Sequence, residues 1–194
     1  MVKRIIALVL VSTLALVWIV SACAQTTPPT DPKKHIPQDK YLNAKQAYEK
    51  WLSNPQGVTI IDVRTPEEYV YLGHAPMAIN LPLETWTGKF DPEKKDVVLA
   101  QNPEFVAKLK ELVKPNNPLL IMCRSGHRSA AAAKLLEKEG FTEVYNVVDG
   151  FEGDKVSDPE SYFDGKRYKN GWKNSGVPWT YSLDPKLLPL MPLK

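Results

Sequence analysis

The chain has 194 residues, of which 43% are hydrophobic and 24% are charged, a composition ordinary for one α/β domain with extensions. Its formal net charge is +3, and it falls to +1 without Lys3 and Arg4. The net charge is therefore too small to create a positive electrostatic potential that would favour nucleic acid as a partner. Because the only cysteines are Cys23 and Cys123, a disulfide framework is excluded and the fold must depend on its core.

The N-terminus has the features of a secretory signal. Residues 1–22 comprise a basic head, an apolar stretch and small residues before Cys23. The segment from Val20 to Cys23 resembles the lipobox of bacterial lipoproteins, which implies that Cys23 is lipidated and becomes the mature N-terminus. We therefore expect an exported, membrane-anchored lipoprotein that faces the periplasm or the cell exterior. Cleavage after Ala24 would instead give a soluble periplasmic protein, and a retained anchor is the third alternative.

The rest of the chain is predicted to comprise a flexible proline-bearing tether over 23–40, one domain over 41–183 and a tail over 184–194. Periodicity and capping signals predict helices at 43–52, 65–73, 102–113 and 126–139. Apolar, β-branched runs predict strands at 58–62, 77–81, 118–122 and 144–148. Alternating strands and helices favour an α/β fold with a mostly parallel central sheet and helices on both faces.

Chemistry is predicted at the loop Cys123-Arg124-Ser125-Gly126-His127-Arg128, between a buried strand and a helix N-terminus. Ligands of parallel sheets bind beyond the carboxyl ends of the strands, and both Cys123 and Asp62 follow strand ends. The helix dipole, the loop amides and the two arginines all favour a thiolate at Cys123. Gly126 allows the backbone to curl so that successive N–H groups form an anion cradle.

Two segments resemble the signatures of rhodanese-like domains. The first signature comprises Ile61-Asp62-Val63-Arg64, Glu68-Tyr69 and Gly73-His74-Ala75. The second comprises the Cys123–Arg128 loop, Ser129-Ala130 and the segment Val144-Tyr145-Asn146-Val147-Val148-Asp149-Gly150. They cover about residues 41–151 in the correct order, and the motifs around Trp172 and Trp179 are similar to the end of this domain after a long insert. The resemblance implies the rhodanese-like three-layer α/β fold.

The resemblance also implies a sulfurtransferase. Cys123 would attack the outer sulfur of a donor such as thiosulfate, release sulfite, hold a persulfide, and pass the sulfur to cyanide or a thiol. The substrate-binding residues would be Arg124, Ser125, Gly126, His127 and Arg128, with the two arginines attracting the donor's sulfonate. No cofactor is implied, and no cluster has the spacing of metal ligands.

Several alternatives stay open. A tyrosine-phosphatase-like loop would place arginine at position 129, where this chain has Ser129, so a phosphatase or arsenate reductase is disfavoured. A non-catalytic persulfide carrier uses the same loop chemistry, and an interaction or sensor module would need no reactive Cys123. For the other residues we expect structural roles: His74 in a turn, Asp62 and Arg64 in ion pairs, and the two tryptophans as packing anchors.

Overall fold

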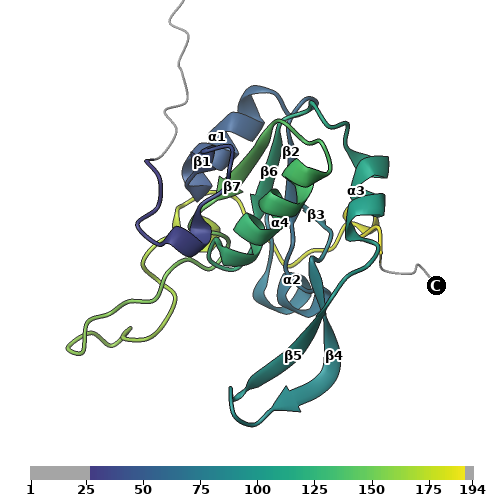
Figure 1. Cartoon of the computed structure of the whole chain (residues 1–194). Helices are drawn as coiled ribbons and strands as arrows, with labels where there is room; N and C mark the ends of the chain where they lie inside the picture. The colour runs from purple at the N-terminus through teal and green to yellow at the C-terminus, as the bar shows by residue number, and fades with distance from the viewer. Residues whose placement is uncertain (1–26, 191–194) are drawn as a thin grey trace, which may run out of the picture.

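The computed structural model describes residues 27–190 and has a five-stranded parallel sheet at its centre (Figure 1). The strand order is β1-β7-β6-β2-β3, and every neighbouring pair is parallel. The strands are β1 (Tyr41–Leu42), β2 (Thr59–Asp62), β3 (Ile79–Asn80), β6 (Leu119–Met122) and β7 (Val144–Val147). Strand β6 is central and buried along its whole length, so its carboxyl end opens at the middle of the sheet edge.

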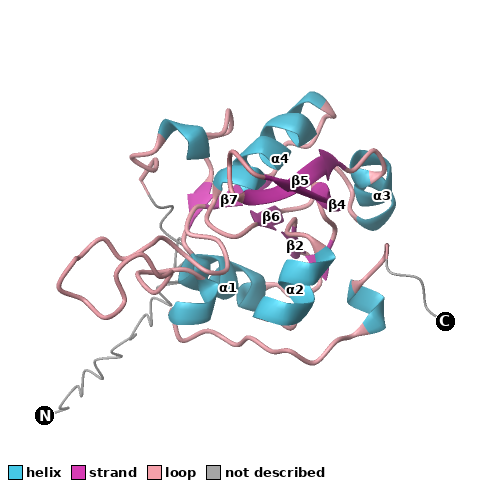
Figure 2. Ribbon diagram, turned by 90° about the horizontal axis from the view of Figure 1, so that it is seen from below, coloured by secondary structure: helices cyan, strands magenta, loops and turns pink. Residues whose placement is uncertain are grey.

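Helices cover both faces of this sheet. Figure 2 shows α1 (Ala44–Ser53) and α2 (Pro66–Leu72) on one face, and α3 (Phe105–Leu112) and α4 (His127–Lys138) on the other. Each face has its own apolar cluster, one around Leu109 and Ile121 and one around Leu120 and Trp172. The predicted fold class is therefore confirmed, because alternating strands and helices bury both faces of a parallel sheet.

The local signals at the helix ends are confirmed. Asn43 caps α1, and Thr65 caps α2 in a capping box with Glu68, whose side chain accepts from the Thr65 N–H at 3.0 Å. Gly73 ends α2 with a φ of 89°. Helix α3 begins later than residue 102 because Asn102 forms a turn, with its side chain accepting from the N–H of Glu104 at 3.0 Å.

An antiparallel hairpin between β3 and α3 was not predicted. It consists of β4 (Glu84–Asp91) and β5 (Asp96–Gln101), with a register shift between Trp86 and Phe90. The hairpin pairs with itself rather than with the parallel sheet and projects from the domain (Figure 1). It carries exposed apolar side chains, which become important at the site described below.

The boundaries of the domain are wider than predicted. Ile36 is 4% exposed and belongs to the core cluster under α4, and the nearby Lys34 forms a 3.0 Å ion pair with Asp154. The predicted tether over 23–40 is thus too long at its C-terminal end, where a 3₁₀ turn at Pro32–Lys34 packs on the domain. The predicted tail also begins too early, since Leu188 is buried.

The segment between β7 and the C-terminal tryptophans is an extended loop over 151–171. Its ends are joined through Asp154 and Asn170, and Trp172 beyond it is fully buried, which confirms one packing anchor. Trp179 stays about one-third exposed and stacks edge-on against Phe151. Cys23 and the predicted signal lie outside the described residues, and within 27–190 no helix is long and apolar enough to cross a bilayer.

Candidate active site

Cys123 lies directly after the central strand β6 and is 1% exposed. The chain then turns through Gly126, whose φ of 94° is open to glycine but strained for other residues, and α4 begins at His127. The Gly126 N–H donates to the Cys123 sulfur at 3.1 Å. This bond and the N-terminus of α4 both favour negative charge on the sulfur.

The segment after β7 supports the loop from outside. The N–H groups of Phe151 and Glu152 donate to the carbonyls of Cys123 and Arg124 at 2.7 Å and 3.0 Å. Gly150 makes this approach possible, because a Cβ there would lie 2.4 Å from the Cys123 carbonyl oxygen. The carbonyls of the loop are thereby held away from the sulfur, as an anion site requires.

A buried polar chain leads from the sulfur to the neighbouring strand. The Ser129 hydroxyl lies 3.3 Å from the Cys123 sulfur and donates to Asn146 Oδ1 at 2.7 Å. The Asn146 amide group donates to the carbonyls of Lys34 and Gly126, at 2.9 Å and 3.2 Å, which fixes its orientation. Ser129 was not among the predicted site residues, although its place in the second signature was the available signal.

Arg128 is held by an ion pair across the sheet edge. Its two terminal nitrogens donate to the two carboxylate oxygens of Glu68, each at 2.6 Å. Burial would raise the pKa of Glu68, but the hydrogen bonds and charge of Arg128 outweigh it and hold that pKa below its usual value. Because Glu68 also completes the capping box of Thr65, this pair ties α2 to the cysteine loop.

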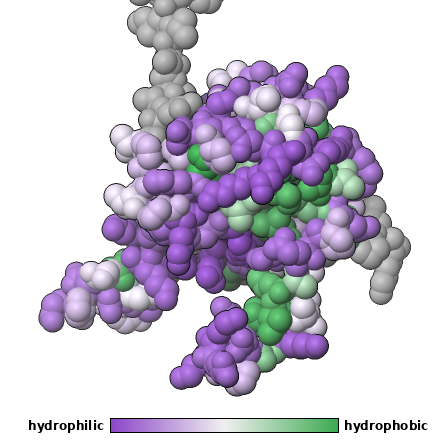
Figure 3. Space-filling view, viewed as in Figure 1, coloured by the Kyte–Doolittle hydropathy of each residue, from purple (hydrophilic) through white to green (hydrophobic). Residues whose placement is uncertain are grey.

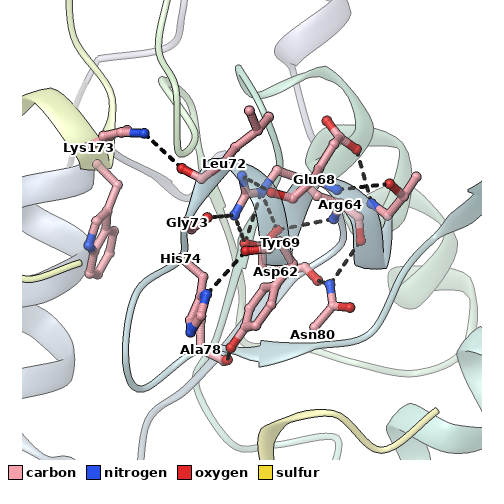
Figure 4. A network of polar contacts seen from close by, with 12 residues as sticks. Asp62, Arg64, Glu68, Tyr69, Leu72, Gly73, His74, Ala78, Asn80 and Lys173 are labelled. Carbon is pink, nitrogen blue, oxygen red and sulfur yellow. Dashed lines mark hydrogen bonds and ion pairs between the residues drawn. The ribbon is translucent and has the colours of Figure 1, made fainter. Parts of the chain in front are cut away.

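Figure 4 shows the polar network that surrounds Asp62 and Arg64 and includes Glu68. Asp62 and Arg64 are fully buried and form a 2.6 Å ion pair, and Arg64 also donates to the Gly73 carbonyl at 2.8 Å. His74 is buried against Tyr69, with its ring nitrogens 3.2 Å from the carbonyls of Tyr69 and Ser182, and burial lowers its pKa. The predicted structural roles of Asp62, Arg64 and His74 are confirmed by these contacts.

The other predicted loop residues differ in their surroundings. Arg124 is exposed, whereas Ser125 is buried. His127 points partly to solvent and lies 2.7 Å from Asp31 of the N-terminal segment. Arg124 therefore remains available to a ligand, while Arg128 and His127 already have acidic partners.

These residues border a cavity of about 570 Å³. Its lining comprises Thr65, Glu67, Glu68, Leu72, Trp86, Asp96, Val97, Leu99, Cys123, Arg124, Ser125, His127, Arg128 and Glu152. The cysteine loop forms one wall, and the unpredicted hairpin forms the facing wall with Trp86, Val97 and Leu99. All the predicted residues of the cysteine loop therefore line the cavity except Gly126. Gly126 contributes through its N–H, which donates to the Cys123 sulfur.

The model of the Rhodanese-like domain matches residues 44–156. This match covers more than half of the chain, and the parallel sheet with Cys123 at the end of its central strand agrees with it. The chain belongs to the rhodanese-like domain family.

The chain is also similar to individual proteins and solved structures. An uncharacterised protein of Rickettsia conorii is 29% identical over 140 residues, which cover 70% of this chain and 93% of that protein. Thiosulfate sulfurtransferase 16 of Arabidopsis thaliana, a chloroplastic protein, is 33% identical over 95 residues, or 49% of this chain and 72% of that protein. The crystal structure of Rv0390 from M. tuberculosis has a TM-score of 0.57 at 29% identity, covering 74% of this chain and 98% of that one.

Proposed function

We propose that the protein is a sulfurtransferase that carries sulfane sulfur as a persulfide on Cys123. The observation that supports this most is the thiol itself, which lies at the end of the central strand, accepts the Gly126 N–H and lines a cavity open to a substrate. The family provides the general chemistry, and the similarity to a protein named thiosulfate sulfurtransferase makes thiosulfate a reasonable first donor.

The reaction has two steps. The Cys123 thiolate attacks the outer sulfur of thiosulfate, the S–S bond of the donor breaks, and sulfite leaves with its electron pair. The persulfide anion then loses its outer sulfur to a thiolate or to cyanide, which regenerates the Cys123 thiolate. The Gly126 N–H and the N-terminus of α4 stabilise the anion in both states, and Arg124 is the exposed cation that can attract an anionic donor.

The proposal is tested by the intact mass of the protein before and after incubation with thiosulfate. One added sulfur atom should map to the peptide that contains Cys123, and Cys123→Ser should show neither the adduct nor sulfur transfer to cyanide. Cys23→Ser serves as the matched control, since it removes the other cysteine of the chain and should leave the adduct in place. Transfer at the wild-type rate by Cys123→Ser would remove the proposed mechanism.

Whether Cys123 acts as an enzyme or as a carrier is decided by turnover. An enzyme should release many equivalents of thiocyanate from thiosulfate and cyanide. A carrier should gain one sulfur atom per chain and turn over poorly with small molecules, because its donor and acceptor are proteins. We propose the enzyme, since the cavity of about 570 Å³ next to Cys123 has the size of a small-molecule site.

We also propose that the protein is exported and anchored to a membrane by acyl chains on Cys23, as the lipobox resemblance implies. Two or more chains supply enough apolar burial for stable anchoring. The protein should therefore partition with bacterial membranes, resist release by high salt and be released by detergent. An unmodified mature N-terminus at Gln25 would contradict the lipid anchor and leave the sulfur chemistry untouched.

A further inference from the structure

The cavity beside Cys123 is much larger than the substrates that rhodanese chemistry minimally requires. At about 570 Å³ it lies in the range of pockets that hold drug-sized ligands, whereas thiosulfate and cyanide have only five and two heavy atoms. A site with this much space beyond the reactive sulfur can accommodate an organic body attached to the sulfur of the substrate.

The wall opposite the cysteine loop is apolar. Trp86 and Leu99 are cross-strand partners in the hairpin, and Val97 lies two residues from Leu99 on the same face of β5. Leu72, at the end of α2, completes this wall. Trp86 and Val97 are each about half exposed although they border the cavity, so a ligand would cover apolar surface that the fold leaves open. In Figure 3 the apolar patch on the hairpin lies where it joins the domain.

The charges of the cavity lining disfavour a negative charge on the organic body of an acceptor, while Arg124 remains available to an anionic donor. Four carboxylates and two guanidinium groups line it, which gives a formal charge of −2 with His127 neutral. Glu68 is neutralised by Arg128, but among residues 27–190 Glu67, Asp96 and Glu152 form no ion pair. Glu152 Oε1 is buried without a hydrogen-bond partner in that part of the chain. A carboxylate of a substrate brought near these three groups would be repelled.

We propose that the sulfur acceptor is an organic thiol with an apolar body and no second negative charge, held between the cysteine loop and the wall formed by Leu72, Trp86, Val97 and Leu99. The inference rests on the proposed function, because the thiol receives its sulfur from the Cys123 persulfide. The acceptor's proton goes to solvent, its thiolate attacks the outer sulfur, the S–S bond at Cys123 breaks, and the products are an organic persulfide and the Cys123 thiolate.

The test follows the discharge of persulfide-loaded protein by three thiols at matched thiolate concentration. Benzyl mercaptan is apolar, 2-mercaptoethanol is small and neutral, and 3-mercaptopropionate carries a carboxylate. We expect benzyl mercaptan to discharge Cys123 at least about tenfold faster than 2-mercaptoethanol, as contact with an apolar wall predicts, and 3-mercaptopropionate to be the slowest. Equal rates with all three thiols would overturn the inference.

The hairpin variants assign the preference to its wall. Trp86→Ala should lower the benzyl mercaptan rate about tenfold and the 2-mercaptoethanol rate much less, whereas Trp86→Phe should keep most of the preference. Tyr162→Ala is the matched control, because Tyr162 is an exposed aromatic outside the hairpin that does not line the cavity. Asp96→Asn should speed discharge by 3-mercaptopropionate alone. The proposed role of the wall would be contradicted if Trp86→Ala slowed discharge by all three thiols equally and Trp86→Phe showed no preference for benzyl mercaptan.

A binding measurement separates this inference from the proposed function. Cys123→Ala, which carries no sulfur, is titrated with benzyl mercaptan and with 3-mercaptopropionate while the Trp86 indole NMR signal is followed. The signal should shift with benzyl mercaptan only. If Cys123 never gains sulfur from any donor but this shift occurs, the proposed function fails and the site stands. If Cys123 gains sulfur and no shift occurs, the acceptor inference alone is overturned.

Discussion

The two walls of the cavity are built in opposite ways. The cysteine loop is enclosed by β6, α4 and the segment after β7, and its sulfur, the carbonyls of Cys123 and Arg124, and the Arg128 side chain have partners. The hairpin is a self-paired ribbon outside the main sheet, with half-exposed apolar side chains and no buried residue in either strand. Chemistry at a sulfur anion requires donors fixed in place, whereas recognition of an organic body requires only apolar area.

This contrast suggests a division of labour between the walls. The loop is fixed by contacts that reach both signatures of the family, including the pair between Glu68 and Arg128 sixty residues apart. The hairpin can change its side chains without disturbing the core, because it contributes little to either apolar cluster. Substitutions in the loop should therefore affect folding and chemistry together, and substitutions in the hairpin should affect specificity.

The largest expected effect comes from paired glycine variants. Gly150→Ala places a Cβ 2.4 Å from the Cys123 carbonyl at a φ of 62°, so the loop must move, and we expect a loss of more than about 3 kcal/mol in the free energy of unfolding. Gly88 in the hairpin has a similar φ of 77°, but a Cβ there would meet no atom within 4 Å. Gly88→Ala should therefore lower the free energy of unfolding only by the backbone strain, about 1–2 kcal/mol. Urea unfolding measures both free energies. Equal losses in the two variants would contradict the difference in rigidity between the cysteine loop and the hairpin.

A second prediction concerns the pH dependence of stability at Asp149, which precedes Gly150. Burial raises its pKa to about 6, although its carboxylate accepts the N–H groups of Ala44 and Gly171. Because the pKa in the folded state exceeds the usual aspartate pKa of 3.8, the folded state binds the extra proton between these values. The stability from this group is therefore lost as pH rises from about 4 to about 6.

The unfolding free energy of the wild type minus that of Asp149→Asn should fall as pH rises over that interval. Because the two pKa values of Asp149 differ by about two, the fall should be at most about 3 kcal/mol. Urea unfolding at several pH values measures it. In the hairpin, the hydrogen bond from the Lys94 N–H lowers the pKa of Asp91. Carboxyl NMR should thus show the two aspartates titrating on opposite sides of the usual value, and a common midpoint would contradict the burial argument.

These cases show which parts of the molecule the sequence predicts. The capping box at Thr65 and the glycine turn at Gly126 are local, so short stretches of sequence carry their signals. The Glu68–Arg128 pair depends on how two distant elements meet, and no spacing along the chain indicates it. The loop residues and the resemblance both pointed to Cys123, whereas only the geometry shows that Arg128 is paired with Glu68.

The hairpin was missed for a physical reason. Its strands have little burial on either face, so they lack the alternation of apolar and polar residues that identifies a half-buried strand. Its turn passes through Lys95 at a φ of 51°, without the Asn-Gly or Asp-Gly pair that marks short hairpins. The same exposure that hides it from sequence analysis makes it available as a cavity wall.

A third prediction compares two ion pairs. Glu68→Gln leaves Arg128, which is mostly buried, without its carboxylate while retaining an oxygen that can serve the capping box. We expect a loss of about 1–3 kcal/mol at neutral pH, together with slower sulfur transfer from a loosened loop. The loss should shrink as pH falls through the lowered pKa of Glu68, because protonation removes the same charge from the wild type.

Lys94→Gln removes the corresponding exposed pair with Asp91 in the hairpin, where the lysine is 81% exposed. That variant should leave the unfolding free energy equal to that of the wild type within the error of the measurement, because exposed pairs contribute little. Urea unfolding of both variants at neutral and acidic pH measures the difference. A loss in Glu68→Gln as small as that in Lys94→Gln would mean that Arg128 does not depend on Glu68 for its place.

The smallest expected effect concerns one hydroxyl proton. Ser129 donates its single hydrogen to Asn146, so in this arrangement the Cys123 thiol must donate to Ser129. When the thiol loses its proton, the Ser129 hydrogen can turn to the sulfur and stabilise the thiolate, and Asn146 Oδ1 gives up its partner. The fixed donation of the Asn146 amide to Lys34 and Gly126 keeps the serine oriented during this exchange.

Ser129→Ala should therefore slow alkylation of Cys123 at neutral pH by about three- to tenfold, the effect of one hydrogen bond of about 1 kcal/mol. Thr87→Val is the matched control, since the Thr87 hydroxyl donates to the Val98 carbonyl at 2.8 Å within the exposed hairpin. Its alkylation rate should equal that of the wild type. Unchanged alkylation in Ser129→Ala would show that the hydroxyl stays with Asn146 throughout and that the Gly126 N–H and the end of α4 stabilise the sulfur without it.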